Sequence, residues 1–189
     1  NISLCIPARS VVGLVGVNGS GKTTLVDVLS GLLVPNAGCV QIDDRALEEI
    51  TRESWQDCIA YVPQHVVLLD ATIAQNIALG VAAEDIDEDR LSHAARLSRL
   101  DEVIAGLPHG YGETIGERGV RLSGGQRQRL GIARALYRDA SMVIMDESTS
   151  ALDVDAEAEI RAASDARRGT RPMLLIAHRM STLRRCDLI

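Results

Sequence analysis

The chain has 189 residues, of which 46% are hydrophobic and 24% charged, and its formal net charge is -6 at pH 7. This composition is typical of a globular protein with one substantial core, and the acidic balance argues against a nucleic-acid-binding surface, which needs basic residues to displace counterions. No run of about 18 apolar residues indicates a membrane span, and the first residues lack the charged and apolar regions typical of a signal peptide. The four cysteines form no C-x-x-C pair of the kind that binds zinc, so we expect reduced thiols.

The first stretch of the chain predicts two strands and a helix. Residues 2–6 alternate apolar with small or polar side chains, and the apolar run 11–15 is typical of a buried parallel strand. A glycine-rich loop follows, and residues 25–30 predict a helix that ends at Gly31.

The loop between that strand and that helix, residues 16–24, fits the pattern G-x-x-x-x-G-K-[ST]. Glycines let such a loop wrap closely so that backbone N–H groups point inward, and the helix adds its positive dipole end, so the segment is suited to bind polyphosphate. Lys22 would neutralise the β and γ phosphates, and the hydroxyl of Thr23 would bind Mg²⁺. A glycine-rich turn that matches by chance is disfavoured, because a strand precedes the loop and a helix follows it.

The next segment predicts small strands around one polar residue. Residues 39–43 predict a short strand, which we expect to join residues 2–6 in an antiparallel layer. After short helical turns, residues 59–62 predict a strand that ends at Pro63 and places Gln64 just beyond it. A lone glutamine there is usually a solvated loop residue, so Gln64 gains weight only from motifs elsewhere.

From about residue 72 to residue 119 the pattern predicts a helical lobe inserted into an α/β core. Residues 84–100 predict one continuous helical run whose start carries five carboxylates, and residues 107–110 are expected to terminate the helix. Acidic residues in a first turn complement the helix dipole, so we interpret these carboxylates as a solvated helix start rather than a metal site. Residues 111–120 contain too much glycine for a regular element.

The segment Leu-Ser-Gly-Gly-Gln at residues 122–126 opens a helix with one apolar face. Ser123 is suited to cap that helix, and two glycines beside a helix N-terminus form a second concavity for an anion. The alternative is a capping serine in a flexible turn, and it would be favoured if the segment stood alone.

Two further buried strands end in polar residues. The apolar run 141–145 is followed by Asp146 and Glu147, and the run 173–177 is followed by His178. Carboxylates at the carboxyl end of a buried parallel strand lie where α/β sheets bind their ligands. Neighbouring residues of a strand point in different directions, so Asp146 can face Mg²⁺ while Glu147 faces an attacking water.

Together these motifs resemble the nucleotide-binding domain of ABC transporters, over essentially the whole chain. That family carries a Walker A loop, a Q-loop, a signature segment, a Walker B strand, a D-loop and an H-loop, in this order. The matching positions here are residues 16–24, Gln64, residues 122–126, Asp146 with Glu147, residues 150–153, and His178.

The resemblance implies an α/β fold, a P-loop NTPase core with a mostly parallel sheet, a small antiparallel β layer and an inserted helical subdomain. We expect residues 1–189 to form a single ABC-type ATPase domain, with the core at 1–71 and 120–189 and the helical subdomain at about 72–119. The chain does not begin with methionine and stops where a strand would start, so we expect it to be truncated at both ends. The aromatic residue that stacks on adenine in this family would then lie upstream.

The resemblance also implies ATP and Mg²⁺ as cofactors, and a head-to-tail dimer in which each ATP lies between the Walker A loop of one domain and the signature of the other. Three residues are expected to be catalytic: Glu147 as general base, His178 as the residue that holds the γ-phosphate, and Gln64 as a sensor of Mg²⁺ and water. The expected metal ligands are Thr23, Gln64 and Asp146. The residues expected to contact ATP, on one domain or the other, are Gly16, Asn18, Gly19, Ser20, Gly21, Lys22, Thr23, Thr24, Ser123, Gly124, Gly125, Gln126 and Asp153.

Residues 72–77, 114–119 and 176–182 are similar to segments of the exporter type within this family. This similarity implies ATP-driven export, a transmembrane domain on the same polypeptide, a second nucleotide-binding domain as partner, no nucleic acid, and a place at the cytoplasmic face of the cell membrane. Residues 107–112 and 135–139 are similar to exporters of lipid-linked oligosaccharides and polysaccharides, with peptide exporters as the other cargo class.

Two other functions stay open at this point. A soluble ATPase of the same superfamily, acting on nucleic acid or ribosomes, would be expected to carry coiled coils, zinc modules or tandem ATPase domains, and the sequence has none of these signals. A catalytically silent binding module is disfavoured by Glu147, His178 and residues 122–126 together. Ser148 stands where exporters usually have alanine or proline, a change that we expect to be tolerated.

Overall fold

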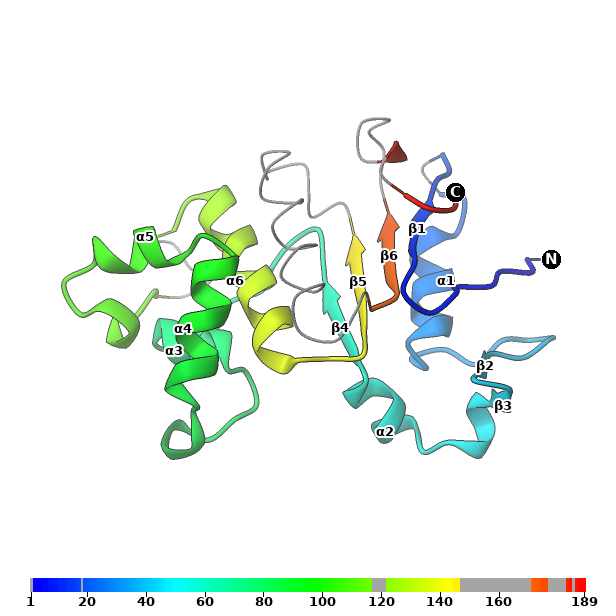
Figure 1. Cartoon of the computed structure of the whole chain (residues 1–189), viewed down its shortest axis with the longest axis horizontal. Coiled ribbons are helices and arrows are strands. Elements are labelled where there is room, and N and C mark those ends of the chain that lie inside the picture. Colours follow the sequence, from blue (N-terminus) through cyan, green and yellow to red (C-terminus); the bar gives the residue numbers. More distant parts are fainter. Residues whose placement is uncertain (1, 18, 117–121, 147–170, 177–182, 185) are drawn as a thin grey trace.

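The computed structural model describes residues 2–17, 19–116, 122–146, 171–176, 183–184 and 186–189. Its centre is a parallel sheet of four strands in the order β1-β6-β5-β4 (Figure 1). Their bounds are β1 Val11–Leu14, β4 Ile59–Val62, β5 Met142–Asp146 and β6 Met173–Ile176. Each corresponds to an apolar run of the sequence, as expected for strands that are covered on both faces.

The two faces of the sheet are filled by alternate residues of the same strands. Val12, Ile144 and Leu174 point to the face covered by α1 (Lys22–Leu29), where they cluster with Val26 of that helix. Their neighbours on the strands point to the other face, where they cluster with Ile132 and Ala135 of a long helix, α6 (Gly124–Arg138). This alternation follows from the period of two residues in a strand.

The end of the chain lies beside β1. Leu188 forms an isolated parallel bridge with Val12, and the amide of Gly13 donates a 2.8 Å hydrogen bond to the Leu188 carbonyl. The side chain of Asp187 accepts from the amide of Val11 at 2.7 Å. Strand β1, which leads into the glycine loop, is therefore held on both of its sides.

The antiparallel layer is a small hairpin of β2 (Gln41–Ile42) and β3 (Arg45–Ala46). Asp43 and Asp44 form its two-residue turn with φ of 49° and 66°, and two positive φ angles match the twist of a tight hairpin. The prediction of a strand at residues 2–6 is wrong: these residues are described without strand pairing and are mostly exposed, because their alternation finds no partner edge within the described part of the chain.

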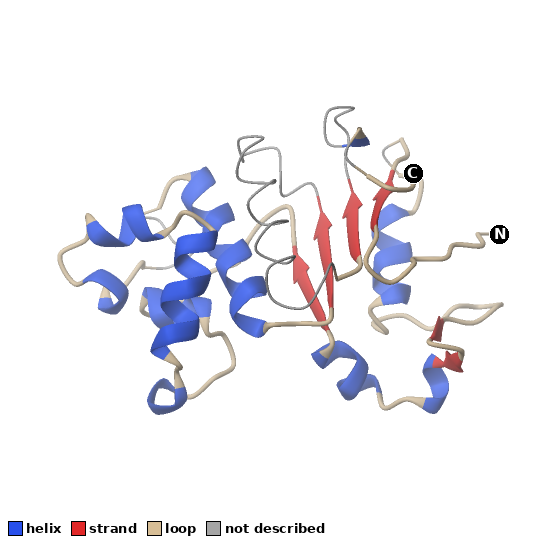
Figure 2. Cartoon of the chain, in the orientation of Figure 1, coloured by secondary structure: helices blue, strands red, loops and turns tan. Residues whose placement is uncertain are grey.

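Short helices connect the hairpin to the sheet, and further helices gather beside β4 (Figure 2). The first group is η1 Leu47–Glu49 and α2 Arg52–Asp57. The second group is α3 Ile73–Ile77, η2 Ala83–Asp85, α4 Glu88–Leu97, α5 Asp101–Ala105 and η3 Gly110–Gly112. No helix within the described ranges is both long enough and apolar enough to cross a membrane.

The second group of helices has its own buried cluster, which includes Ile73, Ile77, Leu91 and Leu100. Helix α6 contributes to it through Leu130, Ala133 and Tyr137, while its other face packs against the sheet. Helix α6 is thus packed against both the sheet and the inserted helices.

The interpretation of the acidic run as a helix start is confirmed, because the side chain of Asp87 accepts from the amide of Arg90 at 2.9 Å and caps α4. The predicted single helix over 84–100 is corrected to a shorter one. Helix α4 ends at Leu97, Arg99 adopts a left-handed φ of 54°, and α5 begins at Asp101. The break lets Leu100 turn fully into the helical cluster.

Candidate functional site

The glycine loop lies at the carboxyl end of β1, as predicted. Gly19 and Gly21 have φ of 79° and 89°, a left-handed conformation that favours glycine, and a Cβ at either position would project into open space. A Cβ on Gly16 would lie 2.5 Å from the hydroxyl oxygen of Ser20, so the loop closes tightly on itself. Asn18 lies outside the described residues.

The side chain of Lys22 folds back over this loop. Its ammonium donates to the carbonyl of Gly16 at 2.7 Å and to the carbonyl of Val17 at 3.1 Å. The positive charge is thereby held among backbone groups of the loop, within reach of an anion that the loop would surround.

Helix α1 begins at Lys22, and the residue before it is Gly21, which has no side chain to cap the first turn. Thr23 and Thr24 are exposed at this end. By contrast, Thr72 caps α3 and Ser123 caps α6 through reciprocal side-chain hydrogen bonds. The uncapped start of α1 leaves backbone N–H groups for an external acceptor, which is the arrangement that binds phosphate.

Asp146 is the last residue of β5 and lies at the same edge of the sheet as the glycine loop, because all four strands are parallel. It is only partly buried, and its Oδ2 accepts a 3.0 Å hydrogen bond from the hydroxyl of Tyr61 on β4. The pKa of the Tyr61 phenol is raised well above its usual value, first by burial and then by the charge and hydrogen bond of Asp146 and the charge of Asp27. Tyr61 therefore stays a proton donor to the carboxylate.

Sequence reasoning did not single out Tyr61. It is a single aromatic residue of a short strand, and its contact with Asp146 depends on the pairing of β4 with β5, which the sequence does not predict. Gln64 follows β4 after Pro63 and is exposed, as expected for the Q-loop position.

The serine-glycine turn before α6 is on the surface. Ser123 and Gly124 are exposed, and the Ser123 hydroxyl accepts from the Gln126 amide at 3.3 Å while the Gln126 side chain accepts from the Ser123 amide at 2.8 Å. The predicted cap is thus confirmed. This turn belongs to the helices beside β4, whereas the glycine loop follows β1 at the other end of the strand order (Figure 1).

Glu147, Asp153 and His178 lie outside the described residues, as do Ser148 and residues 117–121. Strand β6 ends at Ile176, which is the register partner of Asp146. Within the described part of the chain, the structure brings Tyr61 to Asp146 and keeps the serine turn apart from the glycine loop.

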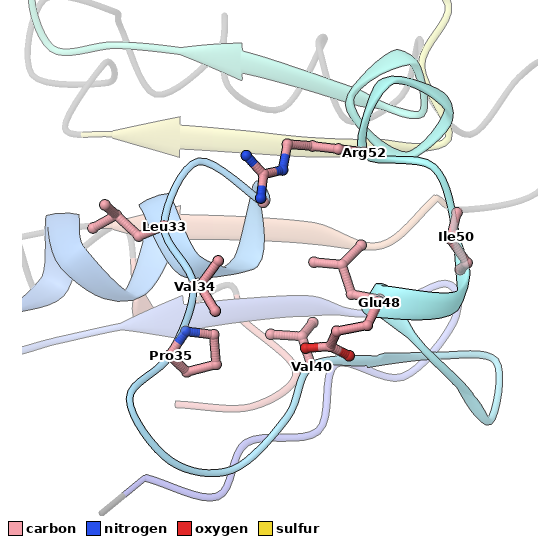
Figure 3. Close-up of a pocket in the computed structure, with 9 residues that line it drawn as sticks. Leu33, Val34, Pro35, Val40, Glu48, Ile50 and Arg52 are labelled. Atoms are coloured by element: carbon pink, nitrogen blue, oxygen red, sulfur yellow. The ribbon is translucent and has the colours of Figure 1, made fainter.

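A hollow of about 190 Å³ lies at the opposite end of α1 (Figure 3). It is lined by Gly31, just beyond that helix, by apolar side chains including Leu33 and Val40, and by Glu48 and Arg52. Helix α1 has 8 residues and is roughly 12 Å long, so this hollow is separate from the glycine loop. It contains none of the predicted site residues.

Comparisons with known proteins agree with the motifs. Residues 1–150 match the family model described as ABC transporter. The chain is 45% identical over 189 residues to an ATP-dependent lipid A-core flippase of Cupriavidus pinatubonensis and 46% identical over 189 residues to one of Dechloromonas aromatica. In each case the match covers 100% of this chain and 32% of the other protein.

A solved structure, that of a bacterial Atm1-family ABC exporter with ATP bound, superposes with a TM-score of 0.87 and 36% identity. The match covers 96% of this chain and 32% of that one, so the chain spans about a third of the length of the proteins it resembles. The family predicted from the order of the motifs is confirmed: this chain belongs to the ABC transporter family and has the fold of the nucleotide-binding domain of an ABC exporter.

Proposed function

We propose that this chain is the ATP-hydrolysing motor of a membrane exporter. The family, the named relatives and the uncapped glycine loop all support ATP as its nucleotide. The soluble alternative, an ATPase acting on nucleic acid or ribosomes, is not favoured, because the relatives quoted above are flippases and the solved structure is an exporter.

The glycine loop would hold the ATP phosphates. Residues Gly16 to Thr24 would supply backbone N–H groups, and Lys22 would exchange the carbonyls of Gly16 and Val17 for phosphate oxygens. Because these donors come mostly from the backbone, they are already oriented before nucleotide binds, and little reorganisation is required when charge develops.

The donors present also fit Mg²⁺, a hard cation that takes oxygen ligands. Tyr61 donates to Oδ2 of Asp146, so among the described residues Oδ1 remains for an ion, and Thr23 is exposed at the start of α1. With Gln64, these are the residues that would hold the ion, which when bound would neutralise phosphate charge. Glu147 would accept the proton of the attacking water, and His178 would hold the γ-phosphate.

The active unit would be a head-to-tail dimer. Ser123, Gly124, Gly125 and Gln126, with Asp153, would contact the ATP held by the glycine loop of a second nucleotide-binding domain. One observation carries this proposal: a capped, exposed serine-glycine turn stands apart from an uncapped glycine loop on the same chain, so each chain offers two incomplete phosphate sites.

The relatives' names suggest the cargo. We infer that the full-length protein carries a transmembrane domain and moves a lipid-linked saccharide such as lipid A-core, with this domain at the cytoplasmic face of the membrane. Exposed apolar side chains flank α3, among them Val67, Leu69 and Leu79, and they offer a surface that the membrane part could cover.

A trapping experiment on the full-length protein tests ATP binding and hydrolysis. Glu147→Gln should retain unhydrolysed ATP after rapid desalting in the presence of Mg²⁺, because nucleotide binding is preserved while the general base is lost. Adding Lys22→Ala to that variant should abolish retention. Failure of Glu147→Gln to retain any ATP at saturating nucleotide would contradict the proposal.

Mixing two defective variants tests the composite site. In the Glu147→Gln background, Lys22→Ala disables the glycine loop and Ser123→Arg blocks the serine turn, so neither homodimer has an intact site. A head-to-tail heterodimer of the two contains one site with both halves intact, and ATP retention should return on mixing. If each site were built within one chain, mixing would restore nothing.

A further inference from the structure

Tyr61 contacts a residue of the proposed metal site although it belongs to none of the motifs. It lies on β4 with Ile144 of β5 as its register partner, and Asp146 is two residues further along β5. Residues two apart on a strand point to the same face, so Tyr61 and Asp146 project from one face of the sheet. Their side chains meet with 3.0 Å between the hydroxyl oxygen and Oδ2.

Among the described residues, this hydrogen bond engages Oδ2 of the carboxylate and none engages Oδ1. A neutral phenol donates to Oδ2 without cancelling the charge of Asp146, and it limits rotation of the carboxylate about its terminal bond. Side chains that ligate metals are commonly oriented by such an outer partner, and losing the partner weakens metal binding.

We propose that the Tyr61 hydroxyl orients the Asp146 carboxylate toward Mg²⁺ bound with ATP, which makes Tyr61 a positioning residue of the metal site. The inference rests on the proposed function, in which Asp146 is a metal ligand. It also links the end of β4, which is followed two residues later by Gln64, to the end of β5.

A purely structural role for the hydroxyl is the competing explanation. Strands β4 and β5 are already paired along their length, from Ile59 with Met142 to Val62 with Met145. Tyr61 is also 42% exposed, and it belongs to none of the three buried clusters. Removal of the hydroxyl alone should therefore leave stability nearly unchanged.

The test is Tyr61→Phe in the full-length protein, with Mn²⁺ as a probe for Mg²⁺. Free Mn²⁺ is measured by electron paramagnetic resonance in the presence of a non-hydrolysable ATP analogue, and the affinity for the analogue is measured separately in EDTA. We expect the apparent Kd for Mn²⁺ to rise about tenfold, the low end for loss of an outer partner, because the site is partly exposed. Nucleotide affinity in EDTA and the unfolding temperature should not change.

Tyr111→Phe is the matched control. Tyr111 lies in η3 among the inserted helices, and loss of its hydroxyl should leave Mn²⁺ affinity unchanged. Asp146→Asn provides the second comparison: if Tyr61 acts through Asp146, adding Tyr61→Phe to Asp146→Asn should cause no further loss of Mn²⁺ affinity.

Unchanged Mn²⁺ affinity in Tyr61→Phe, while Asp146→Asn weakens it, would overturn the inference and leave the proposed function standing. An equal loss of nucleotide affinity in EDTA would likewise overturn it, because that loss would not depend on the metal. If Asp146→Asn itself binds Mn²⁺ as the unmodified protein does, the proposed metal site is wrong and the inference falls with it.

Discussion

Gly131, in the middle of α6, lies against Val66 in the segment that follows Gln64. A Cβ added at Gly131 would stand 2.5 Å from one methyl carbon of Val66 and 3.2 Å from the other, where ordinary contact begins near 3.4 Å. Gly131→Ala therefore requires a displacement of about 0.9 Å, and overpacking of this kind costs roughly 1–3 kcal/mol. Alanine in a helix interior returns about 1 kcal/mol, so we expect a net destabilisation of about 1 kcal/mol.

The double variant makes this prediction sharper. Val66→Ala removes both methyl carbons, and the nearest remaining atom, the Val66 Cβ, lies 3.5 Å from the added Cβ, an ordinary contact. In the Val66→Ala background, Gly131→Ala should therefore stabilise the protein by about 1 kcal/mol, since only the gain in helix propensity remains. The sign of the Gly131 substitution should reverse between the two backgrounds.

The assay is urea denaturation of the four proteins of this cycle, followed by the fluorescence of Trp55, the single tryptophan of the chain. Trp55 donates to the carbonyl of Leu29 at 2.7 Å, so its environment changes when the fold is lost. The expected coupling energy is about 2 kcal/mol. If Gly131→Ala has the same effect in both backgrounds, the close packing of α6 on the segment after Gln64 is not as described.

Three further predictions concern α6 and its neighbours. Arg134 donates to the carbonyls of Asn76 at 2.9 Å and Val67 at 3.2 Å, and a lysine ammonium cannot reproduce this planar pair of donors. Arg134→Lys should therefore lower the free energy of unfolding by about 2 kcal/mol in the same urea assay, and an unchanged free energy would show that these bonds do not contribute. Ser123→Ala should cost about 1 kcal/mol through the lost cap and Ser123→Asn much less; equal losses in the two variants would argue against the cap. Burial raises the pKa of Tyr111 above its unfolded value of 10.0, so its contribution to stability is present below pH 10 and declines as the pH rises further. Above pH 10 the free energy of unfolding should therefore fall less steeply in Tyr111→Phe than in the unmodified protein, and equal slopes in the two proteins would contradict this.

Much of the site could be predicted from the sequence, because the relevant interactions are local. The Ser123 cap is a pair of hydrogen bonds between Ser123 and Gln126, which both belong to the segment 122–126. Likewise, the glycines before Lys22 predict where the backbone adopts positive φ angles. The apolar runs of the sequence predict β1, β4, β5 and β6, with small errors at the ends of the strands. The order of these local motifs was sufficient to identify the family.

Local patterns also produced the two errors in the fold. Residues 2–6 alternate like a strand but have no pairing partner in the described part of the chain, and pairing is a property of two segments. The helix predicted over 84–100 breaks at Arg99, where turning Leu100 into the buried cluster outweighs the continuous helical pattern.

The strand order and the contacts that depend on it came only from the tertiary structure. Tyr61 and Asp146 are 85 residues apart in sequence, and they meet because β4 and β5 are neighbours in one register; shifting that register by a single residue would turn their side chains to opposite faces. The sequence by itself determined which residues we propose to bind phosphate and metal, because the motifs that contain them are short segments. Packing between distant segments decided that Tyr61 contacts Asp146 and that Gly131 lies against Val66.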